Sequence, residues 1–270
     1  MKKYLTLSLL VLAVMAMTSC THVKIGDKDW SIFDLAKGHT NDTPTQVHQV
    51  GTQTTMNTFD ALNVAGPFNV IFEQGEGFNV RVDGTTEQLE KITIYVKESQ
   101  LYIDQRKNEP KGTFDGMRIF VSAPLINCID IAGSGSVTTP KALTVNDLNL
   151  EIAGSGDITI GELTCKDLDI SIAGSGDVII GNIQATDVKN EIAGSGGIDI
   201  AGLICKTVHN EIAGSGDITL NNLKVDNVDT DIAGSGDVIL RGTAGKYTED
   251  IAGSGKVDAS GLQIGTQPIQ

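Results

Sequence analysis

The amino-acid sequence predicts an all-β fold, a right-handed single-stranded parallel β-helix with coils of about 20 residues. The pentapeptide Ile-Ala-Gly-Ser-Gly occurs seven times, at intervals of 19 to 21 residues. A fixed period near 20 indicates stacked units that cannot bury their apolar faces alone. Between the pentapeptides, apolar and polar residues alternate in short runs, which is typical of strands, and no run has the spacing of a long helix.

Stacked coils would place equivalent positions of successive repeats in columns. Coils separated by the strand spacing of about 4.8 Å would bring these side chains into contact. A right-handed coil is predicted because left-handed β-helices repeat in hexapeptides and 20 is not a multiple of six. We expect three short strands per coil, with Gly-Ser-Gly at a corner because glycine tolerates positive φ. One inward column is aliphatic throughout: Val137, Ile158, Val178, Ile198, Ile218, Val238 and Val257.

Residues 1–19 have the features of a lipoprotein signal peptide. Two lysines precede an apolar run over residues 5–17, which is shorter than the roughly 20 residues that span a membrane. Residues 17–20 resemble a bacterial lipobox, which implies cleavage before Cys20 and acylation of its thiol. Thr21 follows the cysteine, and in this respect the chain resembles lipoproteins sorted to the outer membrane, on a face that the sequence does not specify. A plain signal peptide is the alternative.

The remaining chain is divided into a tether and one β-helix domain. Residues 20–57 are polar and turn-rich and are interpreted as the tether. The β-helix domain is assigned to residues 58–270. Within it, residues 58–130 contain five strand-like runs without the pentapeptide and are interpreted as irregular opening coils, with a small separate sheet as the alternative. Residues 131–270 carry the seven repeats.

Composition restricts the partners and the core. The chain has 20 basic and 34 acidic residues, a net charge of −14. A strongly acidic chain without a basic run repels phosphate backbones, so we expect no nucleic-acid partner. A hydrophobic content of 40% is sufficient for a core, and an aromatic content of 4% indicates that this core is aliphatic.

Several segments resemble the putative auto-transporter adhesin, head GIN domain family. They are the opening segment FDALNVAGPFNV at residues 59–70, the strand pair at 92–103, the step at 121–125 and the Gly-Ser-Gly-Asp coils. The resemblance covers about residues 59–260. It implies a right-handed β-helix in an exported or lipid-anchored bacterial protein, with adhesion as the suggested role. It carries over no catalytic motif.

Three cysteines follow Cys20, and all three are predicted to be free thiols. Cys165 and Cys205 fall in one inward column with Ala185 between them. Two layers separate the thiols by roughly 9.6 Å, which exceeds the approximately 7 Å that a disulfide can bridge. Cys128 falls in an outward column on another part of the coil.

The outward columns are acidic and are the only candidates for cation binding. Carboxylates about 4.8 Å apart repel by roughly 0.9 kcal/mol even in water, unless they splay apart or a cation bridges them. Gly-Ser-Gly-Asp is similar to the calcium-binding nonapeptide, but it recurs only once per coil, so each turn has no facing half-site. We therefore expect at most weak cation binding, no confident metal site and no cofactor. The column nominated for weak binding contains Asp157, Asp177, Asp217 and Asp237.

The function predicted is non-catalytic: a lipid-anchored cell-envelope protein with an adhesin-like or other binding role. Expected partners are a membrane through the lipid anchor and a glycan or protein surface ligand, with oligomers forming through the β-helix ends. A polysaccharide-degrading enzyme is one alternative, but aromatic sugar platforms are scarce and His209 is expected to be a solvated outward residue. A purely structural spacer is the other alternative.

Overall fold

The computed structural model describes residues 23–25, 28–30, 54–55, 58–106 and 114–265. The predicted signal peptide, Cys20 and most of the tether lie outside the described residues. Strands β1 (Val23–Ile25) and β2 (Lys28–Trp30) form an antiparallel pair of their own. Strand β3 (Thr54–Thr55) and the strands from residue 61 onward belong to one large sheet system.

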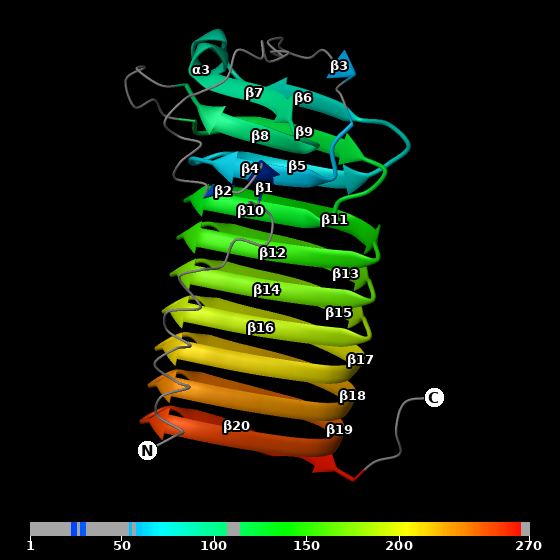
Figure 1. The fold of residues 1–270 in the computed structure, drawn as a ribbon, viewed down its shortest axis with the longest axis vertical. Coiled ribbons are helices and arrows are strands. Elements are labelled where there is room, and N and C mark those ends of the chain that lie inside the picture. The colour runs from blue at the N-terminus through cyan, green and yellow to red at the C-terminus, as the bar shows by residue number, and fades with distance from the viewer. Residues whose placement is uncertain (1–22, 26–27, 31–53, 56–57, 107–113, 266–270) are drawn as a thin grey trace.

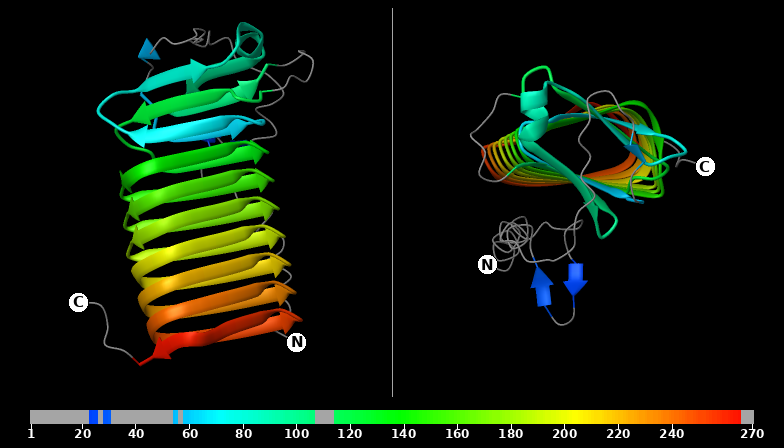
Figure 2. Two further views of the ribbon diagram at one scale, coloured as in Figure 1. Left: turned by 180° about the vertical axis from the view of Figure 1, so that it is seen from behind. Right: turned by 90° about the horizontal axis from the view of Figure 1, so that it is seen from above.

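The regular part of the chain is a stack of flattened coils (Figure 1). A coil has two strands, not the three expected, and they form two long sides that superimpose when seen along the axis (Figure 2). The strands are β10 (Cys128–Gly133), β11 (Ser136–Thr144), β12 (Asp147–Gly154), β13 (Asp157–Thr164), β14 (Asp167–Gly174), β15 (Asp177–Gln184), β16 (Asp187–Gly194), β17 (Gly197–Gly214), β18 (Asp217–Gly234), β19 (Asp237–Gly253) and β20 (Lys256–Ile264).

The pairing register confirms the parallel β-helix with coils of about 20 residues. Ile158 pairs with Val178, and Val178 pairs with Ile198, so the predicted inward column is continuous. All pairings from β10 to β20 are parallel. In β17, β18 and β19 a single strand runs round the second corner, so its first half lies in one side of the coil and its second half in the other.

The opening segment joins the same stack, but its order in space differs from its order in the chain. Strands β4 (Ala61–Ala65) and β5 (Asn69–Gln74) pair with β10 and β11 on one side. On the other side they pair with β8 (Gln100–Gln105) and β9 (Arg118–Ala123). The chain therefore forms one coil, adds a second coil on its far side, and then returns past the first to begin the regular repeats.

The N-terminal end of the stack is closed by antiparallel strands and a short helix. Strand β6 (Asn79–Asp83) pairs antiparallel with β9, and β7 (Ile92–Lys97) pairs antiparallel with β8. Helix α3 (Thr86–Glu90) connects them and begins with a capping box between Thr85 and Gln88. Because the terminal coil is paired in this way, its edge is not available for another parallel strand.

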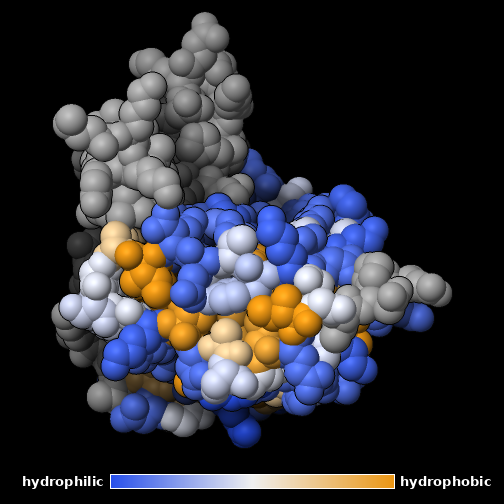
Figure 3. All heavy atoms as spheres, turned by 90° about the horizontal axis from the view of Figure 1, so that it is seen from below, coloured by the Kyte–Doolittle hydropathy of each residue, from blue (hydrophilic) through white to orange (hydrophobic). Residues whose placement is uncertain are grey.

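The C-terminal end has no such closure among the described residues. Strand β20 pairs only with β19, and the second half of β19 pairs only with β18. Ile264 is 58% exposed there, and Ile251 and Val257 are only partly buried. Hydrophobic residues are visible on the surface at this end of the stack (Figure 3). Association through this end stays a prediction.

The core is aliphatic in the repeats and aromatic only near the N-terminal end. Phe59, Phe68 and Phe72 are fully buried in the opening coils. A polar column also runs inside the repeats: Asn190 donates to Asn210 over 2.8 Å, and Asn210 donates to Thr230 over 3.1 Å. These three residues are completely buried. The hydrogen bonds between coils offset part of the free-energy cost of removing their polar side chains from water.

One corner of each coil requires glycine. Gly174 has a φ of +141°, and a Cβ atom at this position would overlap the carbonyl oxygen of Gly154 in the coil above. The neighbouring coils repeat this arrangement at Gly194 and Gly214. The first glycine of Gly-Ser-Gly therefore supplies both the backbone angle and the space that in-register stacking needs.

We expect the substitution Gly174→Ala to lower the free energy of unfolding by about 2–4 kcal/mol, because it adds left-handed strain and a backbone overlap. Gly197→Ala is the matched control: its φ is not in the strained range, and the nearest atom to an added Cβ is Asp177 Oδ1 at 2.9 Å, which can rotate away. Urea unfolding followed by circular dichroism measures both. Equal destabilisation by the two variants would contradict this account of the corner.

Candidate functional site

The side of the stack formed by β12, β14, β16 and the second half of β17 carries an open groove of about 310 Å³. We call this side the groove face. Two outward columns line the groove, because residues two apart in a strand point the same way and the coils are in register. The first column contains Asp147, Asp167, Asp187 and Thr207, and the second contains Asn149, Asp169, Lys189 and His209.

Neighbouring groups hold the carboxylates of the first column in place. Lys166 Nζ lies 2.9 Å from Asp167 Oδ2, and Asn146 donates to Asp147 over 2.6 Å. The hydroxyl of Thr207 donates to Asp187 in the coil above. In the second column, burial raises the pKa of Asp169, although the Lys189 ammonium opposes this effect. The groove therefore combines fixed negative charges with one lysine.

A third outward column on the same face contains several buried polar side chains. Its members are Asp130, Glu151, Ser171, Glu191, Glu211, Asp231 and Asp250. Asp130 is 3% exposed and Glu211 is 5% exposed. Burial, followed by repulsion from Glu151, raises the pKa of Asp130 to about 7. Asp130 Oδ2 and Glu211 Oε1 are buried without a hydrogen-bond partner. This burial could not be predicted from the sequence, because alternation predicts only which side of the strand a residue occupies.

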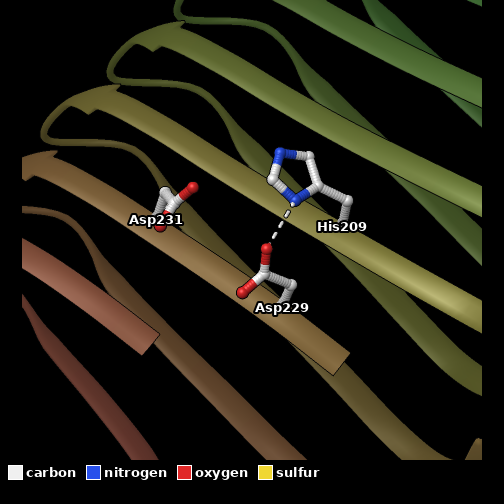
Figure 4. A group of neighbouring side chains, drawn as sticks. All are labelled: His209, Asp229 and Asp231. Atoms are coloured by element: carbon white, nitrogen blue, oxygen red, sulfur yellow. Dashed lines mark ion pairs between the residues drawn. The ribbon is translucent and has the colours of Figure 1, made fainter. Parts of the chain in front are cut away.

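His209 lies where the second and third columns meet. Its Nδ1 is 3.4 Å from Asp229 Oδ2 on the next coil (Figure 4). Its Nε2 is 3.9 Å from Glu211 Oε2 on the same strand. Asp231 lies directly across from Glu211. The Glu211 carboxylate is the main cause of a raised His209 pKa; burial opposes it, and Asp229 and Asp231 add to it. His209 points outward, as predicted, and is half-buried in this cluster.

The nominated cation column lies on the opposite side of the stack. Asp157 Oδ1 accepts a hydrogen bond from the backbone N–H of Asp177 over 3.2 Å, and Asp217 Oδ1 accepts one from Asp237 N–H over 2.9 Å. Asp237 Oδ1 in turn accepts from the N–H of Lys256. Gly197 separates the two pairs. These carboxylates thus bind backbone of the following coil, and weak cation binding at this column stays a prediction.

The cysteines divide into two classes. Cys165 and Cys205 are free thiols, as predicted, and burial raises their pKa to about 11 and about 12. Such thiols are unreactive at neutral pH. Cys128 lies in the outward column of Asn149, as predicted, but it is buried and disulfide-bonded, so the prediction of a free thiol was wrong. Cys20, the predicted lipidation site, lies outside the described residues.

Comparison with protein families identifies the fold family. The model of the putative auto-transporter adhesin, head GIN domain family matches residues 58–224 and 210–270. The chain belongs to this family. No curated protein sequence matches the chain. Within the ranges that the structure describes, no helix is long and apolar enough to cross a membrane.

Solved structures of similar fold include proteins from Bacteroides and Parabacteroides species. A putative adhesin from Bacteroides fragilis is 24% identical, with a TM-score of 0.69 over 77% of this chain and 94% of the other. A putative lipid binding protein from Parabacteroides distasonis is 21% identical, with a TM-score of 0.64 over 81% and 97%. A putative adhesin from Parabacteroides merdae is 15% identical, with a TM-score of 0.64 over 77% and 94%. At these identities the likeness establishes the fold.

The environment of His209 predicts its titration. Its ring signals in an NMR pH titration should have a midpoint above the ordinary value of about 6.5, and Glu211→Gln should lower that midpoint. Because folding favours the protonated ring, this contribution to stability is present below about pH 6.5 and is lost as the pH rises through the folded-state pKa. Asp157→Asn, on the opposite side, should leave the midpoint unchanged. A midpoint insensitive to Glu211→Gln would contradict the assignment of the cause.

Proposed function

We propose that the chain is a non-catalytic, lipid-anchored protein of the bacterial outer membrane that uses the groove face to bind a basic protein surface. The observation that carries the proposal is the groove itself, in which three aligned aspartates, Asp147, Asp167 and Asp187, repeat at the coil spacing. A rigid row of like charges favours a partner with complementary positive charge and speeds its encounter. Membership of an adhesin family agrees with a binding role.

The chemistry of the groove favours binding over catalysis. A hydrolase or lyase needs one acid and one base whose environments differ around a single bond. The first groove column instead repeats the same carboxylate from coil to coil, and each is held by a neighbouring lysine, amide or hydroxyl group. Of the free thiols in the described residues, Cys205 is buried in the core and Cys165 is partly buried against it. This arrangement supports the adhesin-like role over the polysaccharide-degrading alternative.

Binding through the groove face can be tested with two triple variants of equal charge change. We expect Asp147→Asn, Asp167→Asn and Asp187→Asn together to weaken binding to basic matrix proteins by at least about tenfold, with a loss that shrinks as salt is raised. The control combines Asp157→Asn, Asp177→Asn and Asp217→Asn on the opposite side, where asparagine can still accept the backbone hydrogen bonds.

Surface plasmon resonance against matrix proteins, glycans and polylysine distinguishes the outcomes. If both triple variants lose the same amount of affinity, the interaction depends on net charge alone, and a binding site in the groove is contradicted. Binding to a glycan but to no protein would show that the partner is a glycan and would contradict the proposed protein partner. No binding to any probe would favour the spacer, and cleavage of a glycan would favour the enzyme.

The proposed anchor depends on Cys20. In the bacterial host, Cys20→Ser should move the protein from the detergent phase to the aqueous phase, because the acyl chains supply the membrane affinity at about 0.8 kcal/mol per buried methylene. Cys128→Ser is the control and should stay in the detergent phase. Mass spectrometry of the mature N-terminus should find Cys20 acylated. Acylation and a disulfide at Cys20 exclude each other, so a Cys20 thiol that is unmodified or joined in a disulfide, including one to Cys128, would contradict the anchor.

A further inference from the structure

Four side chains form a square on two adjacent coils at the end of the groove. His209 and Glu211 lie two apart on β17, and Asp229 and Asp231 lie directly across from them on β18. One ring nitrogen of His209 and one carboxylate oxygen each from Asp229 and Asp231 all lie within 4.8 Å of one another (Figure 4). Metal–ligand bonds of about 2.0–2.2 Å need ligand atoms roughly 3–4.4 Å apart, so small side-chain rotations would suffice.

We propose that His209, Asp229 and Asp231 bind a divalent first-row transition-metal ion, with Glu211 as the residue that positions His209. The proposal does not depend on the adhesin-like role or on the lipid anchor. It also differs from the weak cation column, which lies on the opposite side of the stack and contains no imidazole.

The contacts of Asp229 fit a ligand role. Its Oδ1 accepts a hydrogen bond from Thr248 over 2.5 Å, which fixes the carboxylate, while its Oδ2 faces His209 Nδ1 at 3.4 Å. One oxygen is therefore held by the next coil and the other is directed at the imidazole. Hydrogen bonds that orient a ligating carboxylate in this way are common around metal ions in proteins.

Glu211 supplies a second, independent observation. It is 5% exposed, its Oε2 faces His209 Nε2 at 3.9 Å, and its Oε1 is buried without a partner. Burying a carboxylate that is incompletely paired is costly. When Nδ1 binds a metal ion, Nε2 carries the proton and donates toward a carboxylate, which is the usual outer partner of a ligating histidine. Glu211 occupies that place.

Electrostatics also favour a cation in the square. The carboxylates of Glu211, Asp229 and Asp231 surround one imidazole on two adjacent strands. The ammonium of Lys189, on the coil above, forms its ion pair with Glu191. A divalent ion would neutralise the carboxylates that now repel one another across the two strands.

The donor set selects the class of metal. One imidazole nitrogen with two carboxylates suits zinc, nickel or a related ion, whereas calcium and magnesium prefer oxygen ligands alone. His209 and Asp229 are 36% and 53% exposed at their side chains, so such an ion would keep open positions for water or for a donor group of a bound partner. His209 also lines the groove, which places those positions at its end.

Isothermal titration calorimetry of the purified full-length protein with Zn²⁺ and Ni²⁺ tests the proposal. The chain has three other histidines, His22, His39 and His48, and these are replaced by asparagine in every sample to remove background binding. We expect one site whose affinity falls at least tenfold in His209→Asn and about 10–100-fold in Glu211→Gln. Asp177→Asn, with a carboxylate removed on the opposite side, is the control and should bind as the parent does.

An NMR titration of the parent with Zn²⁺ provides a readout that needs no variant, because the His209 ring signals should shift and stop titrating with pH. Calcium at millimolar concentration should not displace zinc. The proposal is overturned if no ion binds, if His209→Asn binds with unchanged affinity, if Asp177→Asn loses as much affinity as His209→Asn, or if the His209 signals do not respond.

Discussion

In-register stacking of coils is the constraint on which the rest of the structure depends. Because each coil lies directly on the previous one, every side chain has its counterpart as its nearest neighbour about 4.8 Å away. For inward aliphatic residues this is favourable, since Ile158, Val178 and Ile198 pack in one continuous column. For outward charges it is unfavourable, since a carboxylate then lies next to another carboxylate. The same repetition therefore stabilises the aliphatic core and places like charges next to one another on the surface.

The outward columns show three different ways of compensating. Asp157 and Asp217 direct an oxygen to the backbone of the following coil, so the repeated charge becomes a repeated hydrogen bond. On the groove face, Lys189 interrupts the second column and pairs with Glu191 in the third. The second and third columns also contain acids with a buried, unpartnered oxygen, such as Asp169 and Asp130, and burial raises the pKa of both. The electrostatic cost of stacking is therefore concentrated on the groove face.

Much of the fold could be predicted from the sequence, because a fixed period and strict alternation determine both register and facing. The 20-residue period alone is enough to assign Val178, Cys165 and Cys205 to their inward columns. Counting could not predict that the 100–123 coil lies beyond the 61–74 coil, because that order depends on long-range pairing of strands without the pentapeptide. It also missed the buried Asn190 and Asn210, since amides at inward positions are stable only when the next coil supplies a partner.

A perfect repeat would make every coil equivalent, so chemical specificity can arise only where the repeat is broken. The nominated aspartate column is nearly unbroken, and sequence reasoning selected it because repetition is conspicuous. The square around His209 is the opposite case: an imidazole occurs once in its column, between Lys189 above and Asp229 below. Stacking brings these unlike residues as close together as it brings like ones elsewhere. The regular coils thus provide rigid spacing, and the single irregular position provides a donor set that no other coil in the described stack can match.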